Sequence, residues 1–297
     1  MTGGHVADWP LREHTRTVDA GGIGWHVQIM GAGPPILLVH GTGASSHSFR
    51  SLMPLLARHF MVVTPDLPGH AFSRAPEWFE PSLPATARAI SALLTALRVE
   101  PIVAIGHSAG AALVTRMALD GAIQPQLLVG LGAAFVPFDG IARAVFPRTA
   151  RVLATASRFF PLRVRETRSV ERLLRATGSS LDRQGVELYR RLSERPNHVA
   201  AVLAMMASWD LAPLFAELPD LRVPLVLIAG KRDRAVPLAQ QRAVAARLPR
   251  ARVRVVHGAG HVVHEEQPET VARLILEEFR RNGTMTRLDG GPTHVTP

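Results

Sequence analysis

The chain has 297 residues, 47% of them hydrophobic, which is enough to form a large core and is compatible with a single α/β domain. It contains no cysteine, which excludes disulfides, thiolate metal sites and cysteine nucleophiles. The net charge is +10, but no nucleic-acid-binding module is recognisable and aromatic residues make up only 5%, so a nucleic-acid partner is not expected.

The first elements along the chain predict a hairpin and then a layered α/β fold. Alternating segments at 14–19 and 24–30 are separated by Ala20-Gly21-Gly22, which predicts a β-hairpin. Further strand patterns alternate with helical ones, and these strands lie at 36–39, 60–66, 101–105, 126–132, 224–230 and 252–256. The alternation predicts a mostly parallel, eight-stranded sheet with helices on both faces.

The segment 101–110 carries the most specific motif. A short apolar run ends in Gly106-His107-Ser108-Ala109-Gly110, and a helical pattern follows. Gly-x-Ser-x-Gly between a strand and a helix is typical of a nucleophile elbow, a sharp turn that exposes a serine hydroxyl. Both glycines are needed because a Cβ there would meet the neighbouring strand or helix. Ser108 is the candidate nucleophile, with an ordinary strand-to-helix turn as the alternative.

A serine nucleophile needs an imidazole to accept its proton and a carboxylate to orient that imidazole. Asp233 follows the strand at 224–230 and His261 follows the strand at 252–256. Ligands of open α/β sheets bind beyond the carboxyl ends of the strands, so we expect Ser108, Asp233 and His261 to meet there. The rivals for these roles are Asp66, Asp139 and Asp210 for the acid, and His107, His257 and His264 for the base.

The loop after the strand at 36–39 reads His40-Gly41-Thr42-Gly43. Acyl transfer builds negative charge on a carbonyl oxygen, and preorganised backbone N–H groups stabilise that charge by about 3–4 kcal/mol each. We expect Thr42 and Ala109 to supply these N–H groups. His40 and His107 flank the two positions and are candidate substrate-binding residues, with shaping of the loop as the alternative for His40.

The strand–helix alternation stops after residue 134 and resumes after 219. Helical patterns with proline and glycine breakers fill the interval, which predicts an all-helical cap at 135–219. The α/β core would then consist of 1–134 and 220–283. The segment 284–297, rich in Gly, Thr and Pro, is expected to be a disordered tail.

One helix of the predicted cap, at 199–209, is apolar on nearly all faces, so we expect it to be buried on more than one side. Its Met205, Met206 and Trp209 are candidate substrate-binding residues, because adaptable methionines and an aromatic ring suit an apolar chamber. Core packing is the alternative for all three.

Positive charge is concentrated in the predicted cap. The segment 141–175 has nine arginines against two glutamates, and the arginines are Arg143, Arg148, Arg151, Arg158, Arg163, Arg165, Arg168, Arg172 and Arg175. Such a patch attracts an acidic protein, an anionic membrane surface or a carboxylated substrate. A solvated helical face without a partner is the alternative.

The motifs together resemble a known family. His40-Gly41-Thr42-Gly43, Pro65 to His70, Gly106 to Gly110 and Gly258-Ala259-Gly260-His261 are similar to the α/β-hydrolase superfamily. The cap stretches 171–179 and 197–211 and Asp8-Trp9-Pro10 more narrowly resemble the magnesium chelatase accessory family of bacteriochlorophyll biosynthesis, BchO. The likeness runs over about residues 8–280, and it departs at Ala71, where relatives often have glycine.

The resemblance implies an α/β-hydrolase fold with a role in magnesium-tetrapyrrole synthesis. It also implies the nucleophile at Ser108, the acid at Asp233, the base at His261 and the oxyanion donors at Thr42 and Ala109. The expected function is a serine hydrolase acting on an ester or related carbonyl substrate, with no metal or organic cofactor required.

Two other functions stay open, a tetrapyrrole-binding accessory protein that supports magnesium chelatase and a general esterase or perhydrolase. The expected partners are a small-molecule substrate, such as a tetrapyrrole, and magnesium chelatase or an anionic membrane surface through the cap arginines. No signal-peptide pattern opens the chain and no apolar run reaches the roughly 18 residues of a membrane span, so a cytoplasmic protein is expected, with peripheral membrane contact as the alternative.

Overall fold

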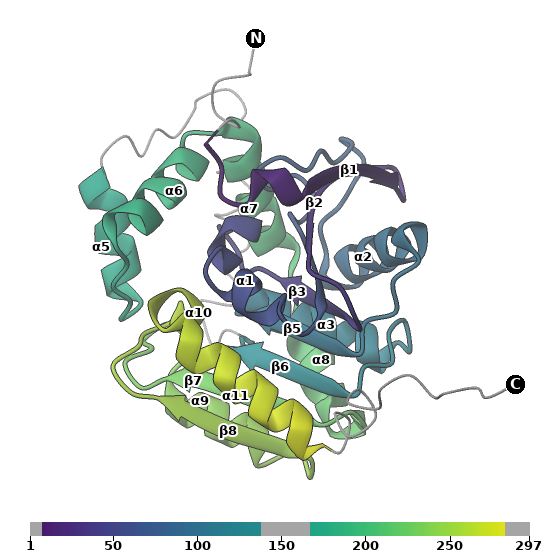
Figure 1. Ribbon diagram of the computed structural model, residues 1–297, viewed down its shortest axis with the longest axis vertical. Helices are drawn as coiled ribbons and strands as arrows, with labels where there is room; N and C mark the ends of the chain where they lie inside the picture. The colour runs from purple at the N-terminus through teal and green to yellow at the C-terminus, as the bar shows by residue number, and fades with distance from the viewer. Residues whose placement is uncertain (1–7, 138–166, 283–297) are drawn as a thin grey trace, which may run out of the picture.

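Runs of buried Val, Ile and Leu form a central sheet in this computed structural model, which describes residues 8–137 and 167–282 (Figure 1). The eight strands are β1 (Thr15–Ala20), β2 (Ile23–Met30), β3 (Pro35–Val39), β4 (Met61–Pro65), β5 (Val103–His107), β6 (Leu127–Leu131), β7 (Leu225–Gly230) and β8 (Ala251–Val256). They lie side by side in the order β1-β2-β4-β3-β5-β6-β7-β8. Strand β2 is antiparallel to both of its neighbours, and the remaining five pairs are parallel. The predicted hairpin and the predicted mostly parallel sheet of eight strands are confirmed.

Helices cover both faces of the sheet because successive strand residues point to opposite sides. In β5, Ala104 belongs to one apolar cluster, whereas Val103 and Ile105 belong to the other. The first cluster includes residues of α2 (Leu83–Leu97), α3 (Ala109–Leu119), α8 (Ala212–Glu217) and α9 (Leu238–Ala245). The second includes residues of α1 (Leu52–Leu56), α10 (Val263–Glu266) and α11 (Pro268–Arg281) (Figure 1). Three short 3₁₀ helices complete the core, η1 (Arg12–His14), η2 (Ser46–Phe49) and η3 (Leu218–Asp220).

The start of α2 follows the sequence signals. The Ser82 hydroxyl accepts a hydrogen bond from the Ala85 N–H at 3.4 Å, and Pro84 occupies the first turn. Proline is tolerated there because the first N–H groups of a helix have no partner within the helix. The predicted N-cap at Ser82 is confirmed.

Three further helices are α5 (Thr167–Ala176), α6 (Arg183–Ser193) and α7 (Pro196–Ser208). Helices α5 and α6 lie apart from the two layers (Figure 1), whereas α7 contributes Met205 to the first apolar cluster. They contact loops that follow the carboxyl ends of strands. His198 of α7 hydrogen-bonds to the loops after β3 and β4, and the connection from α5 to α6 bonds to the loop after β7. These helices therefore lie at the edge of the sheet where the sequence predicts the site.

One helix inside the segment predicted as a cap packs with the core. Helix α8 lies within 135–219, but its Leu214 is 1% exposed within the core cluster that also holds α2 and α3, so α8 packs as part of the core layer. In α7 no residue from 199 to 208 is exposed, and the buried Met205 and Ala207 are two positions apart, about 200° around the helix, so the expected burial on more than one side is confirmed. Residues 138–166, with Arg143, Arg148, Arg151, Arg158, Arg163 and Arg165, and the tail at 284–297 lie outside the described residues.

Within the described ranges, no single helix is long and apolar enough to cross a membrane. Helix α7 together with Ala212–Asp220 passes that test of length and composition only as a pair, with a bend of 58° between the two parts.

An unusual feature of the interior is its histidines. Six buried rings have pKa values lowered from the usual value because burial penalises the charged form, and they are His40, His47, His70, His107, His198 and His264. Desolvation lowers the pKa of His70 and of His264 to about 3. These rings are therefore neutral in the folded protein at neutral pH.

Acid should therefore destabilise the fold. The unfolded chain protonates its histidines below about pH 6.5, whereas folded His70 and His264 stay neutral down to about pH 3, so between these values the unfolded state binds more protons. Each of these rings removes up to roughly 1.4 kcal/mol of unfolding free energy per pH unit in that window. Urea denaturation at neutral pH, about pH 6 and about pH 5 measures the slope. His264→Leu should reduce the slope and His59→Asn, at an exposed ring, should not. A free energy of unfolding that is flat or rises toward acid contradicts the expectation.

Candidate active site

Ser108 lies at a strained turn between β5 and α3. Its backbone has φ 51° and ψ −116°, a conformation that costs an L residue on the order of 1–3 kcal/mol. Two hydrogen bonds hold the turn, from the Ser108 N–H to the Leu131 carbonyl at 2.9 Å and from the Ala134 N–H to the Ser108 carbonyl at 3.2 Å. The end of β6 thus supports the elbow directly.

The glycines on either side of Ser108 are required by close packing. A Cβ at Gly106 would meet backbone atoms of Gly110 and Ala111, at the start of α3. A Cβ at Gly110 would meet the carbonyl oxygens of Val39 and His40. The steric argument made from Gly-x-Ser-x-Gly is confirmed at both positions.

Asp233 and His261 are directly hydrogen-bonded. Asp233 Oδ2 lies 2.9 Å from His261 Nδ1, and Asp233 Oδ1 accepts the N–H groups of Ala235 and Val236, each at 2.9 Å. The carboxylate is buried and accepts three hydrogen bonds, so it is fixed in orientation. Because Nδ1 donates to the carboxylate, the Nε2 of the neutral ring is left as a hydrogen-bond acceptor.

The end of β6 brings this pair next to the elbow. A Cβ built on Gly132 would lie 3.1 Å from His261 Nδ1 and 3.2 Å from Asp233 Oδ2. Leu131, the preceding residue, accepts the hydrogen bond from Ser108 N–H. Ser108, Asp233 and His261 therefore all lie next to the dipeptide Leu131-Gly132. The Ser108 hydroxyl itself forms no hydrogen bond with any part of the chain that the structure describes. The expected hydrogen bond between Ser108 and His261 is therefore not formed in this structure.

The predicted oxyanion donors have free N–H groups. Neither the Thr42 N–H nor the Ala109 N–H donates to a residue in the described ranges, and Ala109 is the first residue of α3, where N–H groups lack partners within the helix. The Thr42 hydroxyl lies 3.9 Å from the sulfur of Met205 in α7. Met205 therefore packs against the loop that carries Thr42.

His40 and His107, predicted as substrate-binding residues, hold the backbone of the site. His40 is 0% exposed, its Nε2 accepts the Leu67 N–H at 2.9 Å and its Nδ1 lies 2.8 Å from the Gly41 carbonyl, so it shapes the loop. His107 is 4% exposed, and its Nε2 lies 3.2 Å from the carbonyl oxygen of His261. Burial keeps both rings neutral by lowering their pKa values.

The remaining predicted substrate-binding residues lie on or just after α7. Met205 is 2% exposed and belongs to the main core cluster, whereas Met206 is half-buried. Trp209 is half-buried and its Nε1–H donates to the Pro81 carbonyl at 2.8 Å, so the indole is fixed against the loop before α2.

The rival residues have other roles. Asp66 is buried with Oδ2 3.0 Å from His26 Nδ1, and its Oδ1 accepts the Ser46 N–H at 2.8 Å. Asp210 accepts the Ala212 N–H at 2.9 Å at the start of α8. His264 packs between Phe49 and His107 with ring centroids 5.0 and 4.6 Å away. Asp139 lies outside the described residues.

Two polar residues of the helical segment, not singled out as site residues by the sequence, support the site. The Ser179 hydroxyl, 2% exposed, accepts the Val262 N–H at 3.1 Å, next to His261. On α7, His198 Nδ1 accepts the Ala71 N–H at 3.1 Å while Nε2 lies 3.3 Å from the Gly43 carbonyl, beside Thr42. Their only sequence signal is that both lie in the cap stretches that resemble the narrower family.

In the described ranges, no group of three or more His, Cys, Asp or Glu side chains is arranged to hold a metal ion.

Residues 34–268 match the family described as alpha/beta hydrolase fold. The chain is 41% identical over 276 residues to the magnesium-chelatase 30 kDa subunit of Rhodobacter capsulatus, covering 91% of this chain and 96% of the relative. It is 30% identical to a pimeloyl-[acyl-carrier protein] methyl ester esterase of Xanthomonas campestris pv. campestris, covering 84% of this chain and 96% of the relative. Among solved structures, a thermophilic esterase from Thermogutta terrifontis superposes with a TM-score of 0.72 at 25% identity, covering 91% of this chain and 99% of that chain.

Removing the Ser179 hydroxyl should destabilise the fold at the loop that carries His261. In Ser179→Ala the buried Val262 N–H loses its acceptor, which costs about 1–3 kcal/mol. Urea denaturation should show this loss, while Ser180→Ala, at an exposed serine whose side chain forms no hydrogen bond with a described residue, should change stability by less than about 0.5 kcal/mol. Equal effects of the two substitutions would count against the role assigned to Ser179.

Proposed function

This chain belongs to the α/β-hydrolase family, and we propose that it is a serine hydrolase acting on an ester or related carbonyl substrate. Its catalytic residues in this proposal are Ser108, His261 and Asp233. The observation that carries the proposal is the convergence of the strained Ser108 turn and the His261–Asp233 hydrogen bond on Leu131 and Gly132.

In the proposed reaction, His261 Nε2 accepts the Ser108 proton as the hydroxyl oxygen attacks the substrate carbonyl carbon. The N–H groups of Thr42 and Ala109 hold the resulting oxyanion. His261 then protonates the leaving alcohol, and the acyl group remains as an ester on Ser108. A water molecule, deprotonated by His261, hydrolyses this ester and restores the enzyme. The hydrogen bond between Ser108 and His261 has to form first, and serine–histidine contacts often tighten only when substrate binds.

The relatives suggest the substrate class. The similarity to a protein named as a magnesium-chelatase subunit supports a link to magnesium-tetrapyrrole synthesis, and the similarity to a methyl ester esterase supports ester chemistry. We propose that α5, α6 and α7 form a cap over the site, with Met205, Met206 and Trp209 toward the substrate. The described cap arginines, Arg168, Arg172 and Arg175, are exposed and suit porphyrin propionates, the chelatase or an anionic membrane surface.

A second function has its own support. The relative with 41% identity carries the name of a chelatase subunit, and the Ser108 hydroxyl is not bonded to His261. Both observations fit an accessory protein that retains the hydrolase frame and binds a tetrapyrrole for the chelatase. Such a protein, purified from a pigment-making host, would retain a bound tetrapyrrole that is detectable by its absorbance.

A fluorophosphonate probe separates the two functions. The probe should label the purified protein at Ser108, Ser108→Ala should abolish labelling, and Ser51→Ala, at an exposed serine without a side-chain cap hydrogen bond, should not. Absence of labelling in the folded protein removes the hydrolase proposal. If Ser108 is labelled but Ser108→Ala still supports pigment synthesis in the host, binding and not catalysis is the biological output.

Replacing the acid should slow the reaction without unfolding the protein. In Asp233→Asn the amide oxygen can still accept from Ala235 and Val236, but the imidazole loses its orienting charge, so kcat on a short acyl ester should fall by roughly three to four orders of magnitude. Asp220→Asn, at an exposed residue of η3, is the matched control and should leave kcat unchanged. A kcat for Asp233→Asn within about tenfold of that of the unmodified protein would show that Asp233 is not one of the catalytic residues.

A further inference from the structure

An open polar cavity of about 630 Å³ lies beside Asp233, the acid among the proposed catalytic residues. Four cationic side chains line it, Arg175 from the end of α5 and Lys231, Arg232 and Arg234 from the loop after β7. Ser179 and Ser180 line the same wall. The cavity therefore lies between a helix of the proposed cap and a loop of the core.

The carboxylates around this cavity do not balance its positive charge. Asp233 also lines the cavity, but both of its carboxylate oxygens are engaged, one by His261 and the other by two backbone N–H groups. Glu171 pairs with Arg175 at 2.6 Å. Glu266 accepts the N–H groups of Gly260 and Ser180 and lies 3.9 Å from Arg232. Within the described ranges, Lys231 and Arg234 are exposed and form no ion pair.

The backbone that carries these cations is fixed on both sides. The N–H groups of Lys231 and Arg232 donate to the carbonyls of Val256 and Ala259, each at 2.9 Å. The Arg234 N–H donates to the Thr177 carbonyl at 3.0 Å, which joins the core loop to the end of α5. Gly178 has φ +85°, and a Cβ on it would meet the Arg232 carbonyl oxygen, so the two loops are in close contact. The backbone of the cavity wall is thus preformed. The Arg232 side chain also hydrogen-bonds to the Gly258 carbonyl, whereas the side chains of Lys231 and Arg234 are exposed and can reach a ligand.

We propose that this cavity binds a small polyvalent oxyanion, a phosphate group or a cluster of carboxylates. Guanidinium groups bind both chemistries through paired N–H donors, and the Lys231 ammonium adds a compact charge. The ligand bridges Arg175 of α5 and the cations after β7, so it holds the cap helix against the core. This inference concerns binding and does not rest on the proposed hydrolase reaction.

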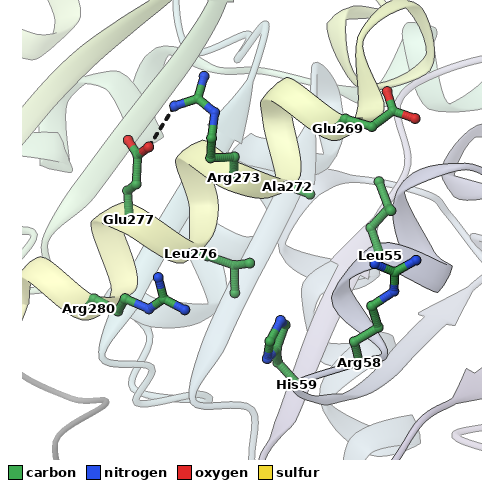
Figure 2. Close-up of a pocket in the computed structure, with 9 residues that line it drawn as sticks. All are labelled: Leu55, Arg58, His59, Glu269, Ala272, Arg273, Leu276, Glu277 and Arg280. Carbon is green, nitrogen blue, oxygen red and sulfur yellow. Dashed lines mark hydrogen bonds and ion pairs between the residues drawn. The ribbon is translucent and has the colours of Figure 1, made fainter.

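A second cavity has a lining that does not suit an oxyanion. The groove between α1 and α11, about 530 Å³, is lined by the apolar side chains of Leu55, Ala272 and Leu276 (Figure 2). Its cations share the groove with carboxylates, since Glu277 binds Arg273 at 2.6 Å and Glu269 lies on the same helix. Arg280 in this groove is a matched control position, an exposed arginine at a cavity of similar size.

The test is calorimetric titration with two probes, inorganic phosphate and the tricarboxylate tricarballylate, at constant ionic strength kept with chloride, because surface charge effects are screened by salt. Either probe should bind the unmodified full-length protein and raise its thermal midpoint, since a ligand that binds only the folded state stabilises it. The double variant Lys231→Gln, Arg234→Gln should raise the Kd of the bound probe at least about tenfold. Arg175→Gln alone tests the cap side and should raise the Kd as well, and Arg280→Gln should leave it unchanged.

Tighter binding of phosphate assigns the site to a phosphate group, and tighter binding of tricarballylate assigns it to carboxylates. Binding of neither probe overturns the proposal. So does an equal Kd in the unmodified protein and the double variant, or an equal loss in Arg280→Gln, which would reflect general charge attraction only. The variants change exposed side chains, and circular dichroism confirms that each one is folded before it is titrated.

Discussion

The hydrogen bond between Asp233 and His261 is the interaction on which the site depends. It joins the loops after β7 and β8, and the backbone N–H groups of Ala235 and Val236 keep the carboxylate in place. Because Asp233 is buried, turning its carboxylate away from these partners would cost free energy, since an unpaired carboxylate in the interior is strongly unfavourable. Ser179 extends this support from the neighbouring helical segment by accepting the Val262 N–H. The imidazole is therefore held by the core and by the neighbouring helical segment together.

Neutral histidines organise the other half of the site. His40 accepts from one loop and faces a carbonyl of its own loop, and His198 joins the loops that follow β3 and β4. Each ring uses one nitrogen as an acceptor, which a protonated imidazole could not do. Burial lowers the pKa of both rings and so preserves the acceptor at neutral pH. The neutral state of these rings shapes the loop of Thr42, and for the same reason we expect acid to destabilise the fold.

Polar groups and close backbone packing join the helical segment to the core, beside the apolar contacts of Met205, Leu188 and Leu192. Ser179, His198 and the Arg234 to Thr177 hydrogen bond all lie at this boundary. Tyr189 of α6 adds a hydrogen bond to buried Glu265, which also pairs with Arg50. Directional contacts of this kind fix the relative position of two segments, whereas apolar packing alone tolerates sliding. The cations around the basic cavity lie along the same boundary.

Local pattern in the sequence determined the strands, the hairpin, the cap of α2 and the need for glycine at 106 and 110, because these follow from short-range sterics and hydrophobic periodicity. The order of Ser108, Asp233 and His261 after their strands also placed them at one edge of a parallel sheet. Tertiary structure alone decided that Ser179 and His198 support that edge, that α8 packs in the core, and that Arg175 and Arg234 face one cavity. It also decided that Asp233 and His261 are joined while the Ser108 hydroxyl has no hydrogen bond to a described residue. Residues 28 to 155 positions apart meet only through packing, and no local propensity encodes the distance between them.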